Sequence, residues 1–79
     1  MGDNRGNRPF DILSNSLGKT VLLRLRGNRE LRGVLKSYDP HLNLYMENAV
    51  LLKNSDEGED EELGQIILRG DNVVMISPP

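Results

Sequence analysis

Residues 20–43, TVLLRLRGNRELRGVLKSYDPHLN, decide the fold that this sequence predicts. Apolar and polar side chains alternate over residues 20–26, which is typical of a strand with one buried face. Gly27-Asn28 predicts a turn, and a second strand follows over about 30–38. Asp39-Pro40 ends that strand, because proline cannot donate a hydrogen bond to a sheet. The stretch therefore predicts two consecutive antiparallel strands.

The flanking sequence predicts one helix and three more strands. Pro9 and the apolar residues after it, at helical spacing, predict a short helix over about 9–17 that ends at Gly18. The other strands are expected over about 43–53, 63–68 and 73–76. In the first of these, one face is expected to hold Leu44, Met46, Val50 and Leu52.

One helix and five short antiparallel strands cannot cover both faces of a flat sheet. We therefore expect a mainly β protein, in which a strongly bent sheet forms a small open barrel of the SH3-like type and the helix caps one end. Gly33, inside a strand, predicts a bend or a close backbone approach rather than a functional role. The strands at 63–68 and 73–76 are apolar and unprotected, so they favour pairing with identical subunits into a ring.

Length and composition agree with one small domain that needs partners. Seventy-nine residues make a single domain, expected over 8–79 after a disordered tail at 1–7. A chain this short buries only roughly 60% of its unfolded surface, and it has no cysteine, so oligomerisation is the remaining common source of stability. No apolar run is long enough for a signal peptide or a membrane span, so we expect a cytoplasmic protein.

The charge is unevenly distributed. The net charge is −2, but six of the twelve acidic residues lie between 56 and 62. Without them, ten basic residues face six acidic ones. The acidic run is interpreted as a solvated hairpin tip, or alternatively as a segment that repels RNA from one face. The remainder is mildly basic, so affinity for nucleic acid would depend on specific contacts or on many copies of a weak site.

Two loops combine groups that suit a nucleobase: residues 39–43 (Asp-Pro-His-Leu-Asn) and 69–72 (Arg-Gly-Asp-Asn). His41 and Arg69 are planar groups that can stack on opposite faces of a base. The Asn43 amide can donate to a uracil carbonyl and accept from its N3–H, which cytosine lacks. Each residue also has a simpler interpretation, as a loop cap, a turn opener or a surface histidine.

Together these segments resemble the two-part signature of the Sm-like (Sm/LSm) RNA-binding family, in its archaeal homo-oligomeric type. The first motif, about 19–53, ends in Asp39 and Asn43 with His41 between them. The second motif, about 63–77, contains an apolar pair followed by arginine and glycine, Ile67-Leu68-Arg69-Gly70. The resemblance implies the Sm fold and a ring, usually of seven subunits, that binds uridine-rich single-stranded RNA at its inner rim.

Supporting roles follow for the neighbouring residues. Asp71 is expected to accept from the Asn43 NH₂ group, and Gly70 to let its backbone approach the base and offer its own N–H. Asp39 is expected to hold its own loop through backbone N–H groups. The resemblance also implies a lateral RNA contact by Arg8 and Tyr38, although Tyr38 could equally pack under the helix.

Other function classes remain as alternatives. The runner-up is a protein-interaction scaffold ring in which RNA binding is incidental. An RNA hydrolase is poorly supported by a single histidine without a paired carboxylate, so no enzyme is expected. Asp39 and His41 could both touch a metal, but two ligands do not make a site, and no metal or cofactor is expected.

Overall fold

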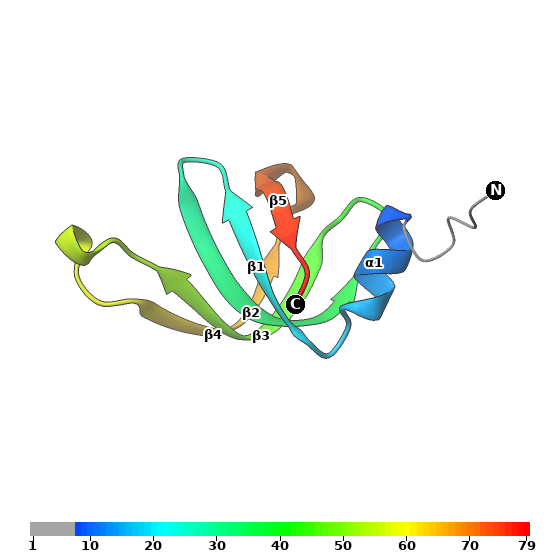
Figure 1. Cartoon of the computed structure of the whole chain (residues 1–79), viewed down its shortest axis with the longest axis horizontal. Helices are drawn as coiled ribbons and strands as arrows, with labels where there is room; N and C mark the ends of the chain where they lie inside the picture. The colour runs from blue at the N-terminus through cyan, green and yellow to red at the C-terminus, as the bar shows by residue number, and fades with distance from the viewer. Residues whose placement is uncertain (1–7) are drawn as a thin grey trace.

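A computed structural model describes residues 8–79, so the tail expected at residues 1–7 lies outside the described part. Its elements, in chain order, are α1 (Pro9–Asn15), β1 (Thr20–Leu25), β2 (Arg29–Tyr38), β3 (Leu44–Leu52), η1 (Ser55–Glu57), β4 (Glu61–Leu68), η2 (Gly70–Asn72) and β5 (Val73–Ser77). The five strands form one antiparallel sheet in the order β4-β3-β2-β1-β5 (Figure 1). The predicted fold class is confirmed.

The helix is shorter than predicted, ending at Asn15 instead of residue 17. Ser16 follows as the cap; its buried hydroxyl donates to the Ile12 carbonyl at 2.8 Å. Gly18 then takes a φ of 79°, a left-handed conformation in which glycine has no steric penalty. The chain therefore turns back soon after the helix ends, and Leu13 is the helix side chain that is buried in the core.

The core lies on the inner face of the bent sheet. Leu31, Gly33 and Leu35 of β2 are all buried, as their alternation predicts. The buried apolar cluster consists of Leu13, Val21, Leu23, Leu31, Leu35, Leu44, Met46 and Ala49. Eight buried side chains make a small core for a 79-residue chain, which agrees with the expected need for partner subunits.

The sheet bends where β2 crosses β3. A Cβ added at Gly33 would lie 3.0 Å from the Met46 Cε and 3.1 Å from the Ala49 Cα, so the close approach predicted for this glycine is confirmed. Asn48 has a φ of 53°, and the pairing of β3 with β4 shifts register between Met46 and Ala49. This is a β-bulge, which increases the bend.

The bulge corrects one part of the sequence interpretation. Because it inserts a residue, the inward face of β3 continues through Ala49 and Leu51 rather than through Val50 and Leu52. Leu51 pairs with the buried Leu31, whereas Val50 lies opposite the exposed Arg32.

Strands β4 and β5 are the two edges of the open sheet, as predicted. Three of their apolar side chains are exposed: Ile67 is 76% exposed on β4, and Val74 and Met75 are 63% and 47% exposed on β5. Isolated subunits would leave these edges unpaired, which favours association with another strand.

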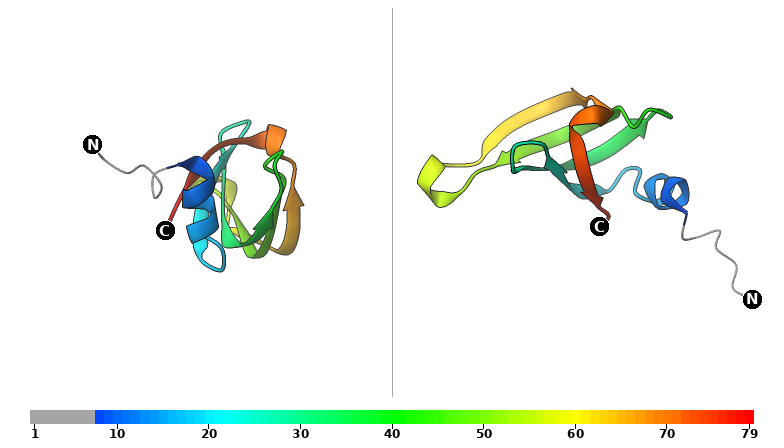
Figure 2. Two further views of the ribbon diagram at one scale, coloured as in Figure 1. Left: turned by 90° about the vertical axis from the view of Figure 1, so that its right-hand side faces the viewer. Right: turned by 90° about the horizontal axis from the view of Figure 1, so that it is seen from above.

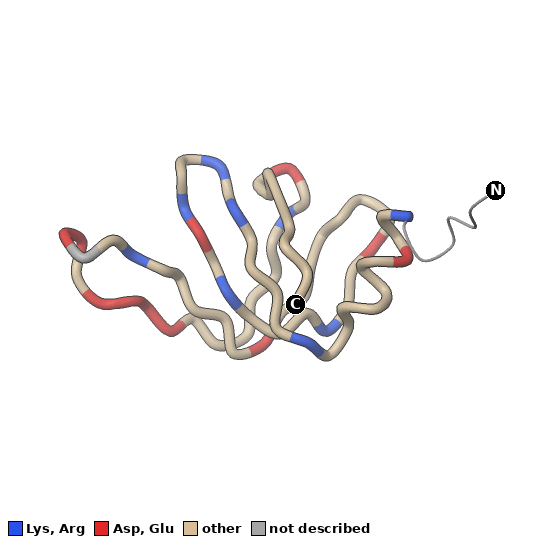
Figure 3. The backbone as a smooth tube through the Cα atoms, in the orientation of Figure 1, with Lys and Arg blue, Asp and Glu red and all other residues tan. Residues whose placement is uncertain are grey.

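The hairpin of β3 and β4 extends far beyond the core (Figures 1 and 2). Strand β4 begins at Glu61, two residues earlier than predicted, because Glu61 and Glu62 pair with the backbone of β3. The acidic residues gather at this end, opposite α1 (Figure 3). Within residues 8–79, no helix has the length and apolar character to cross a membrane.

Candidate nucleic-acid interface

The two loops singled out from the sequence meet in the structure. Pairing of Leu44 with Leu68 brings the start of β3 beside the end of β4, so the loops before and after them adjoin. The backbone N–H of Gly70 donates to Asn43 Oδ1 at 2.9 Å, a contact between residues 27 positions apart. This hydrogen bond joins the 39–43 loop to η2. It corrects the role expected for Gly70, because its N–H is donated to Asn43 and not offered to a base.

Asp39 organises the first loop. Its Oδ1 accepts from the backbone N–H groups of His41 and Asn43, and its Oδ2 accepts from Asn43 Nδ2, all at 2.9 Å. The side-chain hydrogen bond from Asn43, followed by the backbone one, lowers the pKa of the Asp39 carboxyl below its ordinary 3.8. The charged carboxylate thus holds the loop, as expected for this residue.

The orientation of the Asn43 amide follows from its two partners. The Asp39 carboxylate can only accept, and the Gly70 N–H can only donate, so the NH₂ group must face Asp39 and Oδ1 must face Gly70. An amide has two N–H donors and two acceptor lone pairs. One of each is used, which leaves one N–H and one lone pair for a ligand.

The hydrogen-bond partner predicted for the Asn43 NH₂ group, Asp71, is wrong. Asp39 accepts this hydrogen bond, not Asp71. Local geometry explains the difference, because an aspartate readily bonds to groups two to four positions later in its own loop. Asp71 Oδ2 instead lies 3.7 Å from Arg69 Nη2.

Gly70 is required by the close approach of the loops. A Cβ at this position would collide with the His41 carbonyl oxygen and lie 2.9 Å from the Leu42 carbonyl oxygen. Leu42 itself has a φ of 61°, an unusual conformation for a branched side chain. Backbone strain of this kind tends to gather at functional sites, and the sequence pattern gave no signal of it.

The two planar groups predicted to stack on a base are accessible. His41 and Arg69 are exposed, and the Arg69 side chain is 79% exposed. The backbone of His41 is anchored through Asp39, whereas its imidazole forms no hydrogen bond with any residue in the range 8–79. His41 adjoins Asn43 along the chain, and Arg69 adjoins it across the loop contact. Stacking of the two groups on a base stays a prediction.

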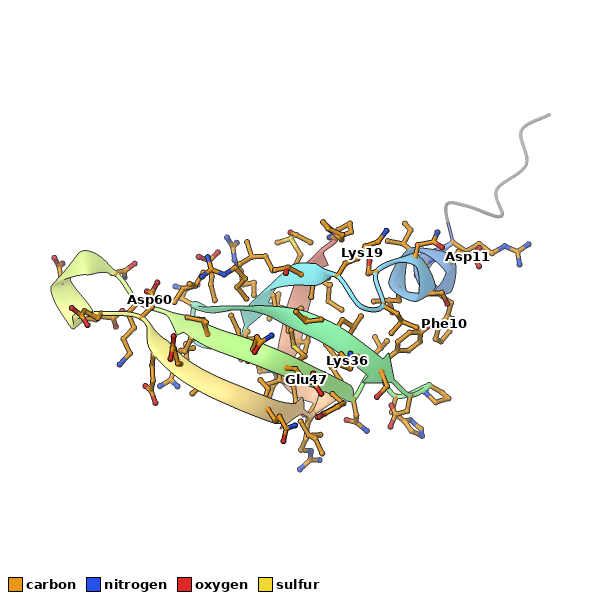
Figure 4. The ribbon with its side chains drawn as sticks, turned by 90° about the horizontal axis from the view of Figure 1, so that it is seen from below. Phe10, Asp11, Lys19, Lys36, Glu47 and Asp60 are labelled. Atoms are coloured by element: carbon orange, nitrogen blue, oxygen red, sulfur yellow. The ribbon has the colours of Figure 1, made fainter. Side chains whose placement is uncertain are left out.

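The two residues predicted to make a lateral RNA contact, Arg8 and Tyr38, lie in different environments. Tyr38 stacks on Phe10 with ring centroids 6.1 Å apart, and its hydroxyl shares a 2.7 Å hydrogen bond with that of Ser14. Figure 4 shows Phe10 on α1, at the end of the molecule opposite the acidic tip. Tyr38 therefore packs against the helix, and exposed Arg8 forms the N-cap of α1.

Residues 11–78 match the family model described as the LSM domain. The chain belongs to the Sm-like family. Among its relatives, a Methanosarcina barkeri protein described as snRNP Sm-like is 52% identical over 73 residues, covering 91% of this chain and 97% of the relative. A Pyrococcus furiosus protein of the same description is 45% identical over 71 residues, covering 90% and 91%.

Solved structures of other family members share the Sm fold. The Sm protein of Pyrococcus abyssii in complex with a uridine heptamer is 40% identical, with a TM-score of 0.80, covering 92% of this chain and all of that chain. A heptameric archaeal Sm protein is 42% identical, with a TM-score of 0.77, covering 85% and 94%. The P. aerophilum SmAP1 heptamer is 35% identical, with a TM-score of 0.82, covering 100% and 97%.

Proposed function

We propose that this Sm-like chain forms a homo-oligomeric ring, most simply a heptamer, that binds uridine-rich single-stranded RNA with one base pocket per subunit. In the pocket, which comprises His41, Asn43, Arg69, Gly70 and Asp71 with Asp39 in support, the base contacts are assigned to His41, Asn43 and Arg69. Gly70 and Asp39 orient the Asn43 amide, and Asp71 lies beside Arg69. A role in cytoplasmic RNA processing or metabolism belongs to the same proposal. Repetition of a weak pocket around a ring would give useful avidity.

The oriented Asn43 amide is the observation that supports the pocket most strongly. Its remaining N–H and lone pair match the O4 carbonyl and the N3–H of uracil. At the same edge cytosine offers an amino donor and an unprotonated N3, so a fixed amide would bind it less well. His41 and Arg69 would add stacking of about 1–3 kcal/mol per base.

Ring formation is supported by the edges and by the family. Ile67 on β4 and Val74 on β5 are exposed apolar side chains on opposite edges of one open sheet. Head-to-tail pairing of β4 with the β5 of a neighbour would cover both, and such a heterologous contact closes into a ring when the rotation fits. The related archaeal structures are heptamers.

Titration of fluorescent oligouridine tests the pocket. Wild-type protein is compared with Asn43→Ala and Arg69→Ala, with Asn15→Ala and Arg32→Ala as matched exposed controls. The two pocket variants should lose about 5- to 150-fold in affinity per engaged base, the equivalent of one stacking or edge contact. Unchanged binding of oligouridine by both pocket variants would contradict the proposed base pocket.

The same assay separates the competing functions. A ring that persists but binds oligouridine and oligocytidine equally well would support the scaffold alternative. We also propose binding without catalysis, since the Asp39 carboxylate bonds to the His41 backbone and not to its imidazole. Cleavage of RNA over time, abolished by His41→Ala, would overturn that part.

The lateral contact is a separate part of the proposal. The Tyr38 hydroxyl is engaged by the helix, so only its ring edge and the exposed Arg8 could contact RNA. Arg8→Gln tests it, and a reduced affinity for long RNA without a change in uridine preference is the expected result.

A further inference from the structure

Positive charge is concentrated on the hairpin formed by β1 and β2. Between residues 20 and 38 there are five basic residues and one acidic residue, Glu30. The basic residues are Arg24, Arg26, Arg29, Arg32 and Lys36. Figure 3 shows several of them near the turn of this hairpin. The net charge of this hairpin, +4, equals the net charge of the whole chain when the six acidic residues between 56 and 62 are left out.

Two of these arginines flank the turn itself. Gly27 and Asn28 both have left-handed φ values, 82° and 58°, which reverse the chain sharply between Arg26 and Arg29. Both arginines are exposed. Within residues 8–79 neither forms an ion pair, whereas Arg24 pairs with Glu30 at 3.3 Å. Two guanidinium groups at one turn, neither in an ion pair with another described residue, add their positive potential there and attract an anion.

The turn adjoins the candidate base pocket. The Arg26 N–H donates to the carbonyl oxygen of Asn72 at 3.0 Å, and Asn72 ends η2, the short helix that begins with the Gly70 that contacts Asn43. Pairing of Leu25 with Val73 continues the same contact into the sheet. A strand of RNA whose base lies at Asn43 therefore has the arginine turn within a short distance along its backbone.

We propose that Arg26 and Arg29 form a phosphate-binding site for the RNA segment next to the base held by Asn43. This inference rests on the proposed function. Guanidinium groups present a planar fork of donors that matches phosphate oxygens, and contacts of this kind add affinity without reading sequence. The base pocket gives the uridine preference, and the arginine turn positions the adjoining backbone.

The competing explanation of these two arginines is that the turn binds a protein, namely a second copy of this chain. A groove of about 660 Å³ separates the turn from the β3–β4 hairpin, and Arg29 lines one wall while Glu57 and Glu61 line the other. The acidic hairpin of a second copy could pair with the turn in the same way. RNA is favoured because the Arg26 backbone adjoins η2, beside the candidate base pocket. Glu57 and Glu61 then confine phosphates to the tip of the turn, outside the groove, where Arg26 and Arg29 flank the bend.

The test compares the double variant Arg26→Gln/Arg29→Gln with a matched control, Lys19→Gln/Lys36→Gln. The control removes the same two charges from exposed positions on the part of the molecule nearer α1 (Figure 4). Affinity for a long oligouridine is measured over a range of salt concentrations, with the nucleoside uridine, which carries no phosphate, as a probe of the base pocket alone. Native mass and circular dichroism are recorded for both variants.

In the double variant, the slope of log K against log salt should shrink by about 0.7 for each phosphate that the two side chains no longer neutralise. Binding of uridine and the native mass should stay at wild-type values. Equal slopes in the double variant and the control would overturn the phosphate site. A changed native mass with unchanged RNA affinity would also overturn it, in favour of a second copy. Failure of the base pocket itself would show separately, as unchanged binding by Asn43→Ala.

Discussion

The backbone N–H of Gly70 donates to the side-chain oxygen of Asn43 at 2.9 Å, and the Asn43 NH₂ group donates to Asp39 at the same distance. Each partner can take only one role, so together they fix which end of the amide faces which way. A glycine and an aspartate, neither of which reads a base, thus determine what the asparagine can recognise. The candidate site depends on this joint between two loops.

Replacement of Gly70 should damage that joint. In Gly70→Ala the new Cβ would meet the carbonyl oxygens of His41 and Leu42, so the loops must separate. We expect a loss of about 1–3 kcal/mol in the free energy of unfolding, measured by denaturant titration, together with weaker oligouridine binding. Gly58→Ala is the control, because its φ of 107° makes it strained but nothing lies within 4 Å of the added Cβ. Normal RNA binding by Gly70→Ala would contradict the close contact.

Acid should weaken the loop only at low pH. The pKa of Asp39 is lowered in the folded protein, so its contribution to stability is complete above its ordinary pKa of 3.8 and is lost as the pH falls through the lower folded value. The difference in unfolding free energy between wild type and Asp39→Asn should therefore be constant above about pH 5 and shrink below it. A difference that already shrinks between neutral pH and pH 5 would indicate another titrating group.

The edge strands should control assembly. Ile67→Asp places a charge on an edge side chain that is 76% exposed in the single subunit and would be covered in a ring. Because burying an unpaired charge is costly, native mass spectrometry should show smaller species than in wild type. Leu17→Asp, at a side chain 41% exposed after α1, should leave the mass unchanged. Equal masses for both variants would argue against assembly through β4.

Much of the architecture could be predicted from local patterns. Alternation of apolar residues in β1 and β2, the Gly27-Asn28 turn and the break at Asp39-Pro40 each act within a few residues, and the structure contains all of them. The two exposed edges were also predicted, since the strands at 63–68 and 73–76 are short and apolar. The two loops were singled out together because each lies between two consecutive predicted strands and because both match the family signature.

The remaining features depend on contacts that periodicity does not encode. The bulge at Asn48 arises where β3 must bend around Gly33, and one inserted residue exchanges the inward and outward faces of the rest of the strand. The choice between Asp39 and Asp71 as the partner of Asn43 was a question of distance in space. The bond from Arg26 to Asn72 is likewise a product of the β1–β5 pairing.

The ratio of affinities for oligouridine and oligocytidine, measured for wild type, Asp39→Asn and Asp71→Asn, tests the central claim most directly. Asp39→Asn replaces an oxygen of the carboxylate by an NH₂ group, so the Asn43 amide loses its fixed orientation. Asp71→Asn removes the same charge from a residue that makes no hydrogen bond to Asn43. We predict that wild type and Asp71→Asn prefer uridine and that Asp39→Asn loses the preference. A full uridine preference in Asp39→Asn would contradict the account.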